Sequence, residues 1–172
     1  MRLFFAICFT DEIKTKLETV SDALYQQSRR GRFVPVENLH LTLAFLGECD
    51  EVHATAAKAV LSSLEFMPFS ISFDQTGCFK RKGGDTWWAG IYENPELLKL
   101  QAELSSRLIA VGFRLEDRAF TPHITLARDV KTGAKPWQID SIDETVCSVD
   151  LMKSEVIDGR IAYIKLASRQ SV

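Results

Sequence analysis

The chain has 172 residues, of which 46% are hydrophobic, and a formal net charge of -2. This length fits one domain, or two small lobes that share a core. The charge excludes a protein that holds nucleic acid through a global basic field and leaves room only for local basic patches.

The first half of the chain is predicted to begin with a buried strand at residues 3–9, which are rich in Phe and Ile. Thr10 or Asp11 can cap the helix that follows, and its apolar face holds Ile13, Leu17, Val20 and Leu24. Residues 28–32 are predicted to be a basic, flexible connection, and residues 33–38 an extended approach, because Pro35 disfavours a helix.

A strong strand is predicted at residues 39–46, ended by Gly47, and Asp50 then caps a second helix. The inner side of this helix is predicted to hold Val52, Ala56, Ala59, Val60 and Leu64. His53, in the same helix, is expected to be an unpaired surface residue.

The second half is rich in predicted strands, at residues 69–73, 77–79 and 86–92, with a basic turn at 80–85. Asn94 and Pro95 start a third helix, which ends at Gly112. Residues 123–128 form the next strand, and residues 130–143 are loop-like. One strand at 145–156 is predicted to pair with residues 161–167 through a hairpin at Asp158 and Gly159.

Four cysteines occur, none of them in a C-x-x-C pair. We expect them to be reduced and largely buried in a cytoplasmic protein. The apolar run at the N-terminus is shorter than the core of a signal peptide, and no stretch approaches the length of a membrane span.

Two of the three histidines lie in the same four-residue pattern, His40-Leu41-Thr42-Leu43 and His123-Ile124-Thr125-Leu126, 83 residues apart. Because side chains alternate between the faces of a strand, His and Thr share one face and the aliphatic residues the other. If the two strands lie next to each other, two imidazoles and two hydroxyls converge.

Paired acid–base chemistry explains these residues better than two other kinds of site. A zinc site fits poorly, since no His-x-His, His-x-x-x-His or neighbouring acidic ligand is present. No nucleophile elbow or adjacent cysteine supports a nucleophilic triad. Two imidazoles can instead act as base and acid, while the hydroxyls donate to phosphate oxygens.

The two motifs, with the flanking segments Arg2–Ile7, Asn38–Gly47 and Pro122–Arg128, resemble the 2H phosphoesterase superfamily. Within it they are similar to the bacterial and archaeal RNA 2′,3′-cyclic phosphodiesterases, or 2′-5′ RNA ligases. The resemblance implies an α+β, bilobal fold, in which two related lobes of antiparallel sheet with outer helices surround a central cleft. Residues 1–172 would be a single domain of two interleaved pseudo-symmetric lobes, with one motif in each.

The same resemblance implies an enzyme that needs no cofactor, neither metal nor ATP. It would open a terminal 2′,3′-cyclic phosphate on RNA to a 2′-phosphate, and the reverse reaction would form a 2′-5′ linkage. His40 would be the proton donor and His123 the proton acceptor, while Thr42 and Thr125 would hold the phosphate. The residues alone do not distinguish the acid from the base, since the two motifs are near-identical.

Substrate contacts outside the motifs are expected from Arg128, Arg32 and Phe45. Arg128 lies five residues after His123, and Phe45 five residues after His40, so on a regular strand both would face away from the histidine. The runs 29–32 and 80–82 can guide an RNA backbone, and four aromatic residues can stack a base: Phe79, Trp87, Trp88 and Tyr92.

The expected partner is an RNA end bearing a 2′,3′-cyclic phosphate, bound by a monomer without metal or membrane. Two alternatives stay open at this point. One is a phosphodiesterase acting on a small cyclic nucleotide or an ADP-ribose cyclic phosphate. The other is a non-catalytic RNA-binding module.

Overall fold

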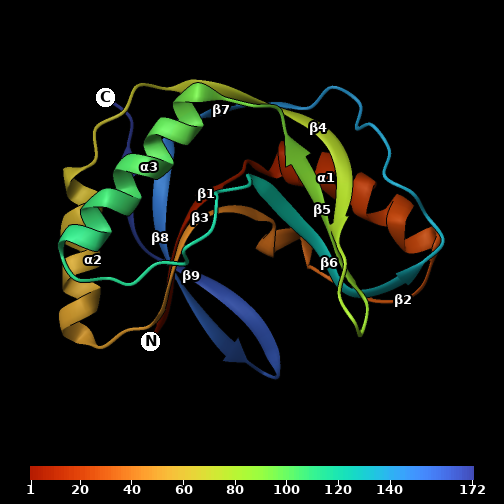
Figure 1. The fold of residues 1–172 in the computed structure, drawn as a ribbon, viewed down its shortest axis with the longest axis horizontal. Coiled ribbons are helices and arrows are strands. Elements are labelled where there is room, and N and C mark those ends of the chain that lie inside the picture. The colour runs from red at the N-terminus through yellow and green to blue at the C-terminus, as the bar shows by residue number, and fades with distance from the viewer.

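The computed structural model describes residues 1–172 as an α+β protein with two antiparallel sheets (Figure 1). The strands of the first sheet run in the order β3-β1-β8-β9, and those of the second in the order β2-β6-β5-β4-β7. The strands are β1 (Arg2–Cys8), β2 (Ser28–Phe33), β3 (His40–Glu48), β4 (Phe69–Phe79), β5 (Asp85–Ile91), β6 (His123–Thr132), β7 (Asp143–Val146), β8 (Ser148–Ile157) and β9 (Arg160–Gln170). The predicted α+β class with two antiparallel sheets is confirmed.

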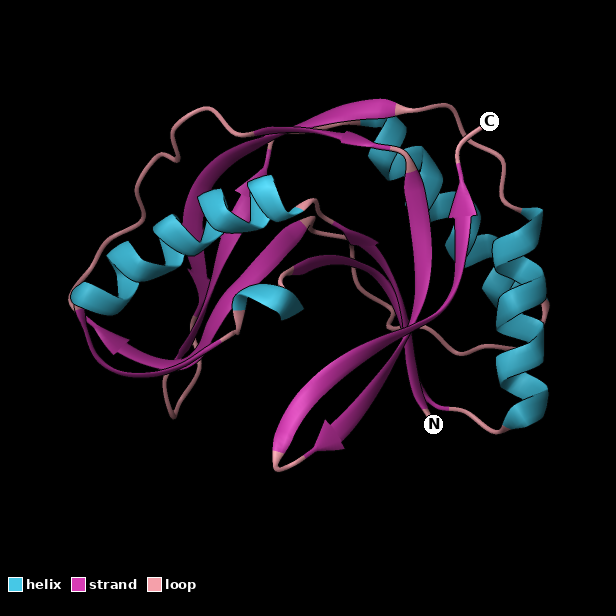
Figure 2. Cartoon of the chain, turned by 180° about the vertical axis from the view of Figure 1, so that it is seen from behind, coloured by secondary structure: helices cyan, strands magenta, loops and turns pink.

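Three α-helices cover the sheets: α1 (Asp11–Gln26), α2 (Glu51–Ser63) and α3 (Pro95–Ala110). Their first turns are capped as predicted, because the side chains of Thr10, Asp50 and Asn94 each accept a backbone N–H three residues on. In Figure 2, α1 lies over the second sheet, while α2 and α3 stand together beside the first. A 3₁₀ turn, η1 (Val36–Asn38), leads into β3.

The strand β1 is the centre of the first sheet, with β3 on one side and β8 on the other. Its alternating residues divide between two environments. Leu3, Phe5 and Ile7 join the large core beneath α2 and α3, whereas Phe4 and Ala6 join a small cluster with Met152 on the opposite face. We call this opposite face the motif face, because His40 lies on it through the pairing of His40 with Cys8.

The hairpin of β8 and β9 extends away from the body of the protein (Figure 1). Its turn is at Asp158 and Gly159, as predicted, and both residues adopt positive φ. Val156 and Ile161 near the tip are exposed, whereas Tyr163, two residues further along β9, lies on the motif face beside His40.

Three predictions about strands are wrong. Residues 28–32 form an edge strand rather than a flexible connection, because β2 pairs with β6 and Arg30 Nη2 donates to the Gly83 carbonyl 2.5 Å away. The predicted strands 69–73 and 77–79 are one strand, β4. The predicted strand 145–156 is divided at Cys147, since β7 pairs with β4 in one sheet and β8 with β1 in the other.

Two predictions about α2 also fail. Its buried face is made by Ala54, Ala57, Val60 and Leu61, with Leu64 just beyond, so only the last part of the predicted face is correct. Val52 is 76% exposed. His53 is exposed as predicted, but it is not unpaired, because its Nδ1 lies 2.6 Å from Asp50 Oδ1.

All four cysteines are free thiols, as expected, but only Cys49 is buried, and Cys147 is exposed. No helix is long and apolar enough to cross a membrane. That the chain consists of two related lobes stays a prediction.

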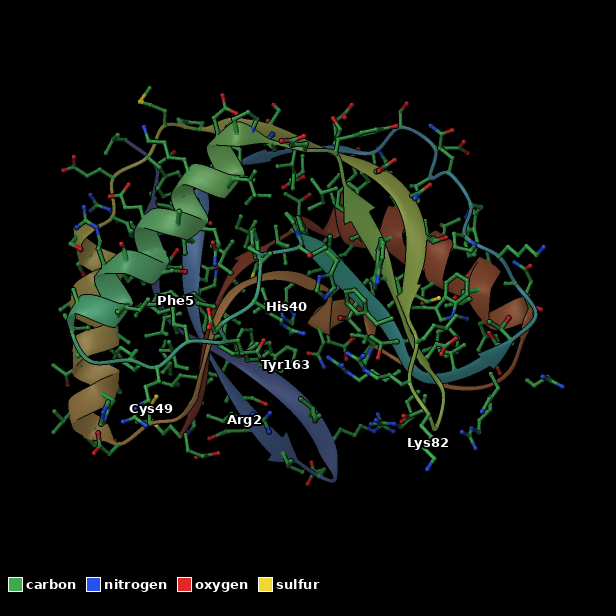
Figure 3. The ribbon with its side chains drawn as sticks, in the orientation of Figure 1. Arg2, Phe5, His40, Cys49, Lys82 and Tyr163 are labelled. Atoms are coloured by element: carbon green, nitrogen blue, oxygen red, sulfur yellow. The ribbon has the colours of Figure 1, made fainter.

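Burial of Phe5 predicts a stability difference that can be measured directly. Phe5 is fully buried and faces α2 and α3 (Figure 3), so Phe5→Ala should lower the free energy of unfolding by about 3–5 kcal/mol. Phe45→Ala is the matched control, because Phe45 lies on the neighbouring strand but is 46% exposed. Urea unfolding would contradict this assignment of the core if both variants lost the same stability.

Candidate active site

His40 begins β3, and a backbone carbonyl sets the orientation of its ring. Its Nδ1 lies 2.7 Å from the Asn38 carbonyl oxygen, to which it donates. This bond leaves Nε2 as the nitrogen that faces Thr42, whose Oγ1 lies 2.9 Å away. In the neutral ring Nε2 therefore accepts from the Thr42 hydroxyl, and in the protonated ring it becomes a donor.

His123 begins β6 and is held in the same way. Its Nδ1 donates to the Thr121 carbonyl oxygen at 2.6 Å, again two residues before the histidine. Both rings consequently present Nε2, and neither uses Nδ1 for any other contact. Two imidazoles with the same exposed nitrogen can exchange protons with one substrate.

The two motif strands belong to different sheets but lie against each other. Leu41 and Leu43 in β3, and Ile124 and Leu126 in β6, are buried at 0–2% exposure, as the alternation predicted. The histidines and threonines are partly exposed on the other side of each strand. Contact between β3 and β6 therefore brings the two His-Thr pairs together.

Both strands contain an extra residue at the same offset from the histidine. Thr42 and Ala44 pair with the consecutive residues Ala6 and Phe5, so Leu43 is a bulge. Thr125 and Ala127 pair with the consecutive residues Trp88 and Trp87, so Leu126 is the matching bulge. The first six residues of both strands share one pattern of burial.

The bulges decide where the residues five positions after each histidine point. After a bulge the alternation shifts by one, so Phe45 and Arg128 return to the histidine face of their strands. Both are exposed, and Phe45 packs against Phe4 with ring centroids 5.7 Å apart. Regular alternation would have turned both residues away from the site.

Arg32 lies directly opposite Arg128 across β2 and β6. Its Nε is 2.6 Å from Asp129 Oδ2, and its side chain is 70% exposed. The carboxylate offsets the repulsion between two neighbouring guanidinium groups. Arg32 therefore stands beside Arg128 at the edge of the second sheet, and no contact joins it to either histidine.

Aromatic rings enclose each imidazole. Tyr163 meets His40 edge-on, with ring centroids 5.0 Å apart (Figure 3). Phe4 packs on the same imidazole, also with centroids 5.0 Å apart. Phe79 meets His123 edge-on at 5.2 Å, and Trp88 lies 6.3 Å away. Phe79 and Trp88 were among the predicted aromatic candidates, but Tyr163 was missed, because only the pairing of β8 with β9 places it there.

The other aromatic and basic candidates lie elsewhere. Trp87 is buried under α1 in a core cluster with Leu24, and Tyr92 accepts a hydrogen bond from Gln138. The basic turn 80–85 protrudes at the end of β4, with Lys82 at its tip (Figure 3). None of these side chains contacts a motif histidine.

Burial lowers the pKa of both histidines below the ordinary value of 6.5. The carbonyls of Asn38 and Thr121 oppose this effect, since an imidazolium donates more strongly to them. Nearby cations lower both values further: Lys14 and Arg128 act on His40, and Arg118 and Arg128 on His123. Arg128 therefore acts on both rings, and a bound anion would counteract its effect.

No group of three or more His, Cys, Asp or Glu side chains is arranged to hold a metal ion. The candidate site contains two imidazoles with aromatic rings beside them, and Thr42, Thr125 and Arg128 lie on the histidine faces of β3 and β6.

Comparison with known proteins agrees with this geometry. A profile of the 2′-5′ RNA ligase superfamily matches residues 9–154. The chain belongs to this superfamily. It is 37% identical over 162 residues to the RNA 2′,3′-cyclic phosphodiesterase of Archaeoglobus fulgidus, covering 94% of this chain and 89% of the relative. It is 36% identical over 148 residues to the enzyme of the same name from Thermotoga maritima, covering 83% and 78%.

The superfamily fold is also found in solved structures similar to this one. The crystal structure of Escherichia coli LigT complexed with 3′-AMP superimposes with a TM-score of 0.89 at 29% sequence identity. The superposition covers 99% of this chain and 97% of LigT. The two-sheet arrangement that joins β3 to β6 is thus the arrangement of the superfamily.

The position of the Trp88 ring beside His123 predicts that adding a side chain at Gly77 will destabilise the protein. Gly77 lies opposite Trp88, and a Cβ at this position would overlap the indole ring, while one at Gly90 would lie 3.0 Å from it. Gly77→Ala should displace the ring and lower the free energy of unfolding by about 1–3 kcal/mol. Gly133→Ala is the control, because nothing lies within 4 Å of a Cβ there. If both variants had the same urea unfolding midpoint and the same tryptophan spectrum, this position of the Trp88 ring would be contradicted.

Proposed function

We propose that this protein hydrolyses terminal 2′,3′-cyclic phosphates on RNA and leaves a 2′-phosphate. The observation that carries the proposal is the convergence of two histidines from neighbouring strands, each with Nδ1 bound to a backbone carbonyl and Nε2 left for a substrate, with Thr42 Oγ1 2.9 Å from Nε2 of His40. Relatives at 36–37% identity that carry the name RNA 2′,3′-cyclic phosphodiesterase support the choice of RNA over a small cyclic nucleotide.

The reaction assigns one proton transfer to each ring. His123 Nε2 takes a proton from water, and the water oxygen attacks phosphorus in line with the P–O3′ bond. That bond breaks, and O3′ takes the proton from His40 Nε2. The products are a 2′-phosphate and a 3′-hydroxyl, and the two rings have exchanged protonation states. We assign His40 as acid and His123 as base from the superfamily resemblance.

Thr42, Thr125 and Arg128 are assigned to the phosphate. Hydroxyl donors and a guanidinium suit the non-bridging oxygens, where negative charge resides through the transition state. Arg128 is supported by its place on the histidine face after the bulge and by its effect on both imidazoles. Phe45 is assigned to the terminal nucleotide, since its exposed ring stands on the same face as His40. Arg32 is assigned a supporting contact to the RNA backbone.

The same site would catalyse 2′-5′ ligation when a 5′-hydroxyl of RNA takes the place of water. The 5′ oxygen attacks phosphorus and gives its proton to one ring, the P–O3′ bond breaks with O3′ taking a proton from the other ring, and the remaining P–O2′ bond makes the new linkage 2′-5′. Function as a cytoplasmic monomer without metal or other cofactor stays a prediction.

A short RNA with a 2′,3′-cyclic phosphate tests the reaction in the presence of EDTA. We expect a 2′-phosphate product from the wild type, and a loss of about 10²–10⁴-fold in kcat for His40→Ala and for His123→Ala. His53→Ala is the matched control, since His53 lies on α2 and pairs only with Asp50. A 3′-phosphate product would show that O2′ leaves and not O3′, and would contradict the assigned geometry of attack. Near-wild-type turnover by either motif variant would contradict the paired mechanism.

The lowered histidine pKa values predict the pH dependence. The acid must be protonated, so kcat/KM falls as the pH rises through the pKa of His40. The base must be neutral, so kcat/KM falls as the pH drops through the pKa of His123. Since both values lie below 6.5, the maximum of kcat/KM should lie below 6.5. The alkaline limb of kcat should lie at higher pH, because the bound phosphate favours the imidazolium. A kcat/KM maximum well above 6.5 would refute this assignment.

A further inference from the structure

Asp150 is the one charged residue that is fully buried, at 0% exposure in β8. A carboxylate removed from water is costly unless a cation accompanies it. Lys165 of β9 supplies that cation, with Nζ 2.9 Å from Asp150 Oδ2, and its side chain remains 51% exposed. The pair therefore has one end inside the protein and one end in solvent.

The strand pairing places this ion pair on the motif face. Asp150 lies opposite Ala6, and Cys8, two residues further along β1, lies opposite His40. Lys165 is two residues from Tyr163, whose ring contacts His40. Its ammonium group pairs with a residue of β8, and only β1 separates β8 from β3 in this sheet.

Lys14 is a second tethered cation near the same place. Its Nζ donates to the Glu37 carbonyl at 3.0 Å, and the next carbonyl, that of Asn38, holds His40. Burial and the Asp150 carboxylate raise the pKa of the Cys8 thiol to about 12, and both Lys165 and Lys14 oppose this rise. Both ammonium groups thus act on the thiol of Cys8, the residue that pairs with His40 across β1 and β3.

Neither Lys14 nor Lys165 is needed to hold the cyclic phosphate in the proposed reaction. An ammonium group has three donors; that of Lys14 donates one to the Glu37 carbonyl, and that of Lys165 forms an ion pair with Asp150. The remaining donors are free for an anion. A buried ion pair contributes little stability compared with a packed apolar pair, whereas it does fix the direction of the lysine.

We infer that Lys165 and Lys14 form a second anion subsite, which binds the phosphate on the 5′ side of the terminal nucleotide while its cyclic phosphate lies at His40 and His123. This inference rests on the proposed function and extends it. In an RNA chain the 5′ phosphate of the terminal nucleotide lies one nucleotide from the cyclic phosphate, so a subsite for it must lie near the two histidines but outside them. A nucleoside 2′,3′-cyclic phosphate with a free 5′-hydroxyl lacks this group, so the subsite would favour RNA ends.

The test compares two small substrates, adenosine 2′,3′-cyclic phosphate with a 5′-hydroxyl and the same compound with a 5′-phosphate. The measured quantity is the ratio of their kcat/KM values at low salt. We expect the 5′-phosphate to raise kcat/KM about 10-fold in the wild type, which corresponds to about 1.4 kcal/mol. Lys14→Gln and the double variant Lys165→Gln/Asp150→Asn should each bring the ratio towards one.

The double variant removes the buried charge together with its partner, so that folding does not have to tolerate an uncompensated carboxylate. Lys153→Gln is the matched control, because Lys153 lies on β8 with its side chain on the opposite face, paired with Glu155. It should keep the wild-type ratio. A purely structural role for Lys165 would lower both kcat/KM values equally and leave the ratio unchanged.

A wild-type ratio near one, or an unchanged ratio in both lysine variants, would overturn the inference while leaving hydrolysis, and hence the proposed function, intact. Failure of the wild type to hydrolyse either compound or a short RNA would instead overturn the proposed function and the inference with it.

Discussion

The hydrogen bond from Nδ1 of each motif histidine to a carbonyl two residues earlier is the constraint on which the site depends. A free imidazole can present either nitrogen, and this bond selects Nε2 in both rings. For His40 the carbonyl belongs to Asn38, which is itself anchored, because its side-chain amide donates to the Ile161 carbonyl at 2.9 Å. The strand β9 of the hairpin therefore holds the first histidine through Asn38 as well as through the ring of Tyr163.

The two motif strands share the same backbone irregularity, a bulge three residues after the histidine, but carry different side chains beyond it. A bulge at Leu43 in β3 and another at Leu126 in β6 turn the fifth residue after each histidine back to the histidine face. That residue is aromatic in one strand, Phe45, and cationic in the other, Arg128. The equivalent backbone thus produces an unequal site, with an apolar surface beside His40 and a guanidinium beside His123.

The electrostatics of the site favour an anion. Burial and the surrounding cations both lower the pKa of the imidazoles, so the rings stay neutral to lower pH than ordinary histidines. A negatively charged ligand has the opposite effect, because it stabilises the imidazolium and compensates Arg128 and Lys14. Burial is the main cause of the lowered pKa values, and the cations that add to it also attract the anion that allows one ring to be protonated.

Local sequence patterns determined the helices, their caps, most strands and the two His-Thr pairs, because alternation and capping depend on neighbouring residues in the chain. The assignment of strands to sheets depended on distant hydrogen bonds, so residues 28–32 formed an edge strand and residues 145–156 were divided between two sheets. Tyr163 and the Asp150–Lys165 pair reached the motif face for the same reason, through the pairing of β8 with β9. The sequence by itself determined which residue types form the site. Only the tertiary structure decided which way Phe45 and Arg128 point, since a bulge arises from the register between two strands and not from the sequence of one.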